Sequence, residues 1–171
     1  MGNPSEKFSK IYDKYIDKIY RFVFLKVSSQ ETAEDLTSEV FLRTWGFFKE
    51  KSQEIENIQA FLYKTARNLV TDHYRQKGRI RIVSVDNPLV IDPRQDLEKE
   101  SEVNSDMEAI RRVIPELKDD YQNILIWHYL DDLSVNEISE LLGRTKGATR
   151  VLLHRALKSL RKALKDKIEQ V

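Results

Sequence analysis

The sequence predicts an all-α protein built from two small helical domains that a flexible linker joins. Only five glycines and four prolines interrupt its 171 residues, so long helices have few internal breaks. Apolar side chains recur at three- and four-residue steps, the spacing that places them on one face of a helix. This pattern fails from residue 78 and resumes near residue 103. We therefore expect domains at 4–77 and 103–171 and a linker at 78–102.

The first domain is predicted to contain three helices. The first covers about Pro4 to Val27, with an apolar face that begins at Phe8. Ser28 and Glu31 have the spacing of a capping box for the second helix, which continues to about Phe48. The third helix spans roughly Ile55 to Gln76, with Ile58, Leu62, Thr65, Ala66 and Leu69 facing inward.

The linker contains one glycine and two prolines, and its apolar residues follow no sustained helical or strand spacing. A short strand at Ile80 to Val85 is the alternative for its first part. No partner strand is visible in the sequence, so we favour an extended chain of about 20 residues.

The second domain begins with a helix at Val103 to Ile114, which stops before a proline, and a helix at Tyr121 to Leu130. Ser134 and Glu137 then form a second predicted capping box, at the start of a short helix. Glycine at position 143 suits the left-handed residue that ends such a helix.

A short helix, a tight turn with glycine and a longer basic helix are the parts of a helix-turn-helix. Thr145 is the predicted cap of the longer helix, which reaches about Lys165. Any antiparallel helix pair uses the same turn chemistry, so a purely structural hairpin is the alternative.

The distribution of charge favours the DNA-binding interpretation. The net charge of the chain is only +1, so the total charge gives no argument for nucleic-acid binding. However, residues 144–167 contain nine Lys and Arg against Asp166 alone, and residues 61–82 contain six against Asp72 alone. An acid-rich stretch separates them. This asymmetry predicts a nucleic-acid surface in two pieces.

The basic helix should show its cations on one side. At about 100° per residue, Leu153 belongs to the predicted core face, Leu152 to its border and Val151 to the middle of the basic face. A single exposed valine is usually without a role. The functional alternative is a contact with a thymine methyl group in the major groove.

The first basic patch interleaves cations with aromatics. Lys64, Asn68, Thr71 and Arg75 share a helical stripe. Phe61, Tyr63 and Tyr74 accompany them, and aromatic platforms with cations suit single-stranded bases. Alternatively, Phe61 is core and the charges form a solvated face. Adjacent Asp72 and His73 point apart on a helix, which argues against a catalytic or metal site there.

Four stretches together resemble a known family. Residues 33–45 and 60–75 resemble the second conserved region of bacterial RNA polymerase sigma factors of the extracytoplasmic-function (ECF) group of the sigma-70 family. Residues 114–125 and 133–164 resemble the fourth region. The resemblance covers nearly the whole chain and implies a region 2 helical bundle, a linker and a region 4 helix-turn-helix.

The resemblance implies that core RNA polymerase is the main partner, through the clamp coiled coil of its largest subunit and the flap of its second-largest subunit. The implied polymerase-binding residues are Asp35, Leu36, Glu39, Val40, Phe41, Arg43 and Trp45.

Promoter DNA is the second implied partner. Capture and melting of the minus-ten element would use Phe61, Tyr63, Lys64, Arg67, Asn68, Asp72 and Arg75. Reading of the minus-thirty-five element in duplex form would use Thr145, Lys146, Arg150, Val151, His154, Arg155 and Lys158. An anti-sigma factor is a further implied partner.

One departure from the family lies in the reading helix. Val151 and Leu152 stand where the family often has a serine and an arginine. We expect this change to alter the preferred minus-thirty-five sequence and to leave the fold intact.

The sequence therefore predicts a promoter-specificity subunit that is not an enzyme and needs no metal or cofactor. An autonomous helix-turn-helix regulator is the first alternative, and a purely protein-binding helical module is the second. No cysteine is present, and no apolar run approaches a signal peptide or a membrane span. We expect a cytoplasmic protein without membrane contact of its own.

Overall fold

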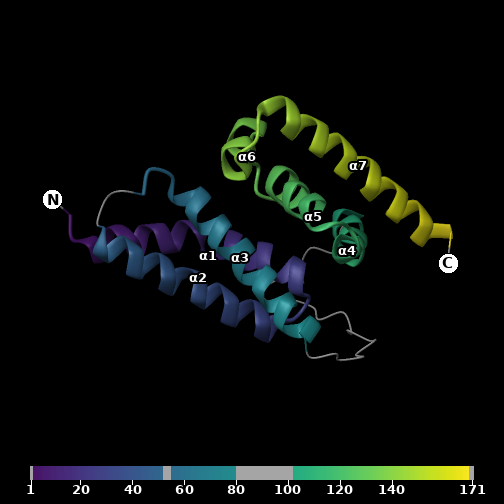
Figure 1. The fold of residues 1–171 in the computed structure, drawn as a ribbon. Coiled ribbons are helices and arrows are strands. Elements are labelled where there is room, and N and C mark those ends of the chain that lie inside the picture. Colours follow the sequence, from purple (N-terminus) through teal and green to yellow (C-terminus); the bar gives the residue numbers. More distant parts are fainter. Residues whose placement is uncertain (1, 52–54, 80–101, 170–171) are drawn as a thin grey trace. The chain divides into compact units, whose positions relative to one another are not determined.

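The computed structural model describes residues 2–51, 55–79 and 102–169 (Figure 1). Internal contacts divide the chain into two compact units, Met1–Asn87 and Pro88–Val171. The described residues are mainly helical and include no β-strand, which confirms the all-α prediction. Residues 78 and 79 end a helix and residue 102 begins one. The rest of the predicted linker, with the alternative strand, lies outside the described residues.

Unit 1 is a bundle of three long helices, coloured purple to teal in Figure 1: α1 (Pro4–Val27), α2 (Gln30–Glu50) and α3 (Ile58–Arg79). Each helix packs against the other two. The fully buried centre of the unit comes from all three helices and includes Ile19, Phe22, Val23, Val40, Leu62, Tyr63 and Ala66. Each helix therefore has one face committed to the core.

The corner between α1 and α2 uses two adjacent serines differently. Ser28 ends α1 in the left-handed region, with φ of 55°. Ser29 caps α2, because its hydroxyl accepts a hydrogen bond of 3.3 Å from the amide of Thr32. The predicted capping box of Ser28 with Glu31 is therefore wrong. Only two residues separate the helices, so one must turn the chain while the other caps.

Helix α3 begins three residues later than predicted and is fixed at both ends. The side chain of Asn57 accepts a hydrogen bond of 3.0 Å from the amide of Ala60 at the N-terminal end. Near the other end, the Tyr74 hydroxyl donates to the carbonyl of Lys26, in the last turn of α1. The exposed side of α3 is consequently held at a set orientation within unit 1.

Unit 2 contains four α-helices in its described part: α4 (Glu102–Val113), α5 (Asp119–Leu125), α6 (Val135–Leu142) and α7 (Lys146–Glu169). A 3-10 turn, η1 (Ile114–Glu116), follows α4. Helix α7 contacts α4, α5 and α6. The helix predicted at Tyr121 to Leu130 is α-helical only to Leu125 and continues as a π-helical turn, η2 (Ile126–Leu130).

The segment 124–127 lies at the centre of unit 2. Its four side chains, which include Trp127, are all buried. The carbonyl of Trp127 accepts a hydrogen bond of 2.8 Å from the amide of Leu133. The wider π-helical turn thus ends against the residues that lead into α6, and it positions the helix-turn-helix on the core.

The predicted start and stop signals of α6 are confirmed. The amide of Glu137 donates to the Ser134 hydroxyl at 3.1 Å, and the amide of Ser134 donates to the Glu137 carboxylate at 2.8 Å. Gly143 ends the helix with φ of 64°, a conformation that costs a residue with a side chain more than it costs glycine.

The capping box gives a first prediction. Replacement of Ser134 by alanine should lower the free energy of unfolding of unit 2 by about 1 kcal/mol, because the amide of Glu137 loses its hydrogen-bond acceptor. The chain has two tryptophans, one in each unit, so a Trp45→Phe background leaves Trp127 as the fluorescent reporter of unit 2. Urea titration in that background measures the change.

The exposed Asn136, on the same helix, provides the control. Its replacement by alanine removes no cap and should move the urea midpoint much less. Equal midpoints for the Ser134→Ala variant and its parent would contradict the prediction.

Candidate nucleic-acid and protein interfaces

The buried side of α7 differs in one respect from the predicted side. Thr149, Leu152 and Ala156 are buried, whereas Leu153 is only half-buried. The prediction that Leu153 is at the centre of the core face, with Leu152 at its border, was therefore wrong. That prediction took the direction of the core face from the leucine-rich C-terminal half of the helix. In the structure, three helices pack on α7, and the buried side is rotated toward Leu152.

The seven predicted reading residues all lie on the surface: Thr145, Lys146, Arg150, Val151, His154, Arg155 and Lys158. Val151 is 50% exposed, as predicted for the basic face. Among the residues that the structure describes, no ion pair engages the cations in this set. We call this set the reading face of α7. Its cations are available to an external anion such as a phosphate backbone.

The start of α7 is held in place by hydrogen bonds. The Thr145 hydroxyl accepts from the amide of Ala148 at 3.1 Å, which confirms it as the cap. The Thr149 hydroxyl donates to the carbonyl of Thr145 at 2.8 Å, so the buried hydroxyl is satisfied within its own helix. In the turn before α7, Arg144 pairs with Asp120 of α5 at 3.3 Å. These contacts position the first turn of the reading face.

On α3, the predicted polar stripe is exposed. Lys64, Asn68, Asp72 and Arg75 are exposed, and Arg67 is half-buried. Asp72 and Arg75 approach to 4.0 Å with both side chains mostly in solvent, so their attraction is weak. The stripe therefore remains free to contact a ligand.

His73 lies beside this stripe, and its surroundings favour the neutral imidazole. Partial burial lowers the pKa of its imidazole, and Lys77 lowers that pKa further. The part of the chain that the structure describes holds no group of three His, Asp or Glu side chains arranged to bind a metal. None of its helices is long and apolar enough to cross a membrane.

The aromatic residues of the first patch divide between core and surface. Tyr63 is completely buried and packs edge-to-face on Phe22, with 5.6 Å between ring centroids. It cannot stack on a base in this arrangement, so its assignment to the DNA surface was wrong. The reason is that it shares the inward face of α3 with Leu62. Phe61 is half-buried against Phe47, at 5.1 Å.

The predicted polymerase-binding set on α2 also divides. Val40 is completely buried, so it stabilises unit 1 and does not present its side chain to a partner. Phe41 is also a core residue, but one edge of it lines an apolar groove. Two further members, Asp35 and Arg43, are exposed. The remaining members, Leu36, Glu39 and Trp45, are half-buried.

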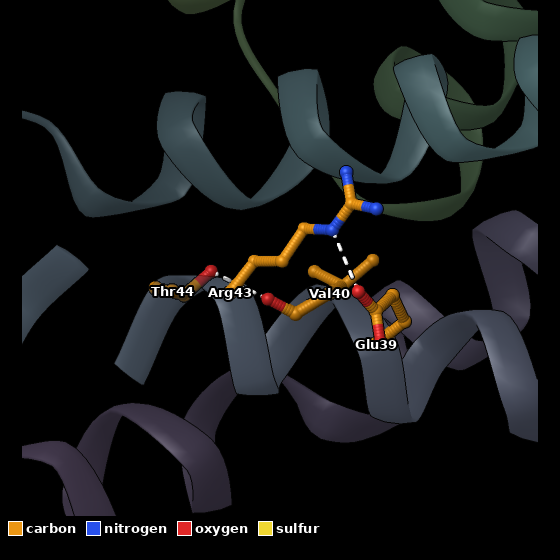
Figure 2. A network of polar contacts seen from close by, with 4 residues as sticks. All are labelled: Glu39, Val40, Arg43 and Thr44. Carbon is orange, nitrogen blue, oxygen red and sulfur yellow. Dashed lines mark hydrogen bonds and ion pairs between the residues drawn. The ribbon is translucent and has the colours of Figure 1, made fainter. Parts of the chain in front are cut away.

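Figure 2 shows the polar contacts along α2. The Arg43 guanidinium donates to the Glu39 carboxylate at 2.7 Å, one helical turn away. The Thr44 hydroxyl donates to the carbonyl of Val40 at 2.7 Å. Because Thr44 points inward and Arg43 outward, the two contacts mark the buried and exposed sides of the helix.

Sequence reasoning missed Leu42. Its side chain is 64% exposed, which is unusual for a leucine in the middle of a long helix. It borders an apolar groove of about 540 Å³ between α1 and α2, lined by Ser5, Phe8, Ser9, Tyr12, Ile16, Ser38, Phe41, Leu42 and Trp45. The spacing held a signal, since the inward residues Ala33, Thr37, Val40 and Thr44 leave Leu42 on the opposite side.

Two family models match the chain in the order of its two units. The model for sigma-70 region 2 matches residues 11–80, and the model for sigma-70 region 4 matches residues 107–160. The chain belongs to the sigma-70 family, in its ECF group. Unit 1 therefore carries the region 2 match of this ECF family member, and α6 and residues 146–160 of α7 lie within its region 4 match. The region 2 match disfavours an autonomous helix-turn-helix regulator.

Named relatives support the same family. The chain is 32% identical over 170 residues to the ECF RNA polymerase sigma factor BldN of Streptomyces coelicolor, covering 96% of this chain but only 63% of that relative. It is 28% identical to the ECF RNA polymerase sigma factor SigW of Bacillus subtilis, covering 94% of this chain and 90% of the relative.

Solved structures share the fold. The sigma factor RpoE of Bartonella quintana, in complex with the anti-sigma factor NepR, matches with a TM-score of 0.73 over 94% of this chain and 98% of that chain, at 17% identity. CnrH, in complex with the cytosolic domain of CnrY, matches with a TM-score of 0.69 over 96% and 91%, at 13% identity.

Proposed function

We propose that this protein is a sigma factor, which binds core RNA polymerase and directs it to a specific set of promoters. Residues 4–77 act as region 2 and residues 103–171 as region 4. The ordered match of both sigma-70 regions carries the proposal. The protein supplies recognition and no bond chemistry, which the polymerase provides. It acts in the cytoplasm, where the polymerase is.

Region 4 reads the minus-thirty-five element. The reading face of α7 is cationic and exposed, and it begins at a turn held by the Arg144 to Asp120 pair. A helix of this kind enters the major groove with its N-terminal residues at the base edges. Its C-terminal cations lie beside phosphates, so binding weakens as salt concentration rises.

Region 2 captures and melts the minus-ten element through the exposed stripe of α3. Lys64 and Arg75 contact phosphates, while Asn68 between them hydrogen-bonds to the edge of an unpaired base. Phe61, half-buried beside Phe47, offers a ring surface at the start of the stripe. Stacking and edge hydrogen bonds offset the few kcal/mol needed to unstack a base.

The exposed side of α2 binds the clamp coiled coil of the largest polymerase subunit. Asp35 and the Glu39 to Arg43 pair supply charged contacts, and Leu42 supplies an apolar one. Region 4 contacts the flap of the second-largest subunit. An anti-sigma factor is a further partner. This partner is supported by the fold that the chain shares with the sigma factor RpoE, whose structure contains the anti-sigma factor NepR.

Run-off transcription tests the proposal directly. The full chain with core polymerase of the same organism should give specific transcripts that core polymerase alone does not give. The free chain should show no comparable preference for its promoter. Tight, specific binding by the free chain, without stimulation of core polymerase, would favour an autonomous regulator instead.

Replacement of Leu42 by alanine should weaken binding to core polymerase about tenfold, as expected from the loss of about 1.4 kcal/mol of apolar burial. The affinity of labelled chain for core polymerase measures the loss. Ile168 near the end of α7, which is 74% exposed, is the matched control. If the Leu42→Ala chain binds core polymerase as tightly as the unsubstituted chain, the exposed side of α2 is not the contact.

Replacement of Asn68 by alanine should impair promoter melting more than promoter binding, because a base-edge contact forms only with an unpaired base. Permanganate reactivity of thymines in the minus-ten element measures melting, and retardation at low temperature measures closed binding. The exposed Gln76 of α3 is the control position. Normal permanganate reactivity in Asn68→Ala would refute the role of this side chain.

A further inference from the structure

Val151 lies at the centre of the reading face. With about 100° between successive residues, its direction is within about 60° of His154, Arg155 and Lys158. All three neighbours are exposed. The buried residues Thr149, Leu152 and Ala156 lie at least about 100° away. The Val151 side chain therefore faces the ligand of the reading face.

On the N-terminal side of Val151, the helix surface is apolar and carries only short side chains. Gly147 and Ala148 precede it by one turn on the same side of the helix, and both are exposed. Apart from its chain neighbours and the nearby backbone of its own helix, no atom lies within 4 Å of the position that a Cβ on Gly147 would take. We call Gly147, Ala148 and Val151 the apolar patch. Its short side chains let a base pair approach the helix closely.

Long cationic side chains flank the apolar patch. Arg150 lies at one edge, about 100° from Val151, and Arg155 and Lys158 follow Val151 one and two turns later on the same side of the helix. Such flanking charge suits a nucleic acid, whose phosphates would lie on either side of the groove. It does not suit an apolar protein surface, which would leave these cations without partners. The occupant that fits the patch is therefore a base-pair edge.

Among the groups that base pairs present in the major groove, the 5-methyl group of thymine is the apolar one. Valine has no side-chain hydrogen-bond donor or acceptor, so it cannot read the polar edges of the other bases. We propose that Val151 packs against the 5-methyl group of a thymine in the minus-thirty-five element, with Gly147 and Ala148 leaving room for that base pair. The proposal rests on the proposed function and adds a specificity-determining residue to it.

Removal of the methyl group alone tests the contact. Holoenzyme made from the full chain and core polymerase would first select its preferred element from duplex promoters randomised upstream. Each thymine of that element would then be replaced by deoxyuridine, which lacks only the methyl group. At one position, the wild-type holoenzyme should bind about fourfold more weakly, the loss expected for one buried methyl group.

The Val151→Ala holoenzyme should bind the thymine promoter at least about fourfold more weakly and show no further loss with deoxyuridine at that position. A Val151→Thr holoenzyme keeps one methyl group and the side-chain shape, and it should retain part of the discrimination. The combination of Val151→Ala in the protein with deoxyuridine in the promoter separates the methyl contact from a general effect on α7. A damaged helix would lose affinity for both promoters and would still discriminate between them.

Three outcomes would overturn the proposal. The first is an element with no thymine at the positions that Val151→Ala affects. The second is a wild-type holoenzyme insensitive to every deoxyuridine, and the third is equal discrimination by the wild type and Val151→Ala. The Arg155→Ala variant serves as the reference. If it loses promoter affinity in the same assay while one of these three outcomes is found, the proposed function stands and only the Val151 contact is refuted. A holoenzyme without any promoter preference would overturn the proposed function itself.

Discussion

The burial of Thr149, Leu152 and Ala156 holds α7 against the other helices of unit 2, and the proposed DNA contact depends on it. A helix that commits one side to a core must present the opposite side to solvent. The cations of α7, with Val151 among them, lie on that opposite side. If α7 were rotated by one residue, the apolar patch would turn away from the groove and a cation would turn toward the core.

Two buried threonines show how a hydroxyl group can find a hydrogen-bond partner where long helices pack closely. Thr44 in α2 and Thr149 in α7 are both completely buried, and each donates to the carbonyl four residues earlier. A small side chain at such a position lets a neighbouring helix approach, and the internal hydrogen bond avoids the cost of burying a free hydroxyl. The same device thus supports the proposed polymerase-binding helix and the proposed reading helix.

The three proposed surfaces differ in chemistry, in agreement with their proposed partners. The stripe on α3 is polar with one half-buried ring at its start, as a surface for unpaired bases requires. The reading face of α7 combines cations with short apolar side chains, which suits a duplex groove. The exposed side of α2 combines an ion pair with Leu42 and the adjacent groove, a mixture typical of protein interfaces.

The sequence by itself determined the helices, the capping signals of α6 and α7, and the separation of charge, because these depend on neighbours within one or two turns. It also placed Val151 on the surface, since periodicity fixes the side of a helix to within a residue or so. Only the tertiary structure decided that Tyr63 is core, that Leu153 is half-buried and that Leu152 is buried in its place. Burial depends on how many helices pack on a given side. A residue pattern along one helix carries no information about the angle at which its neighbours cross it.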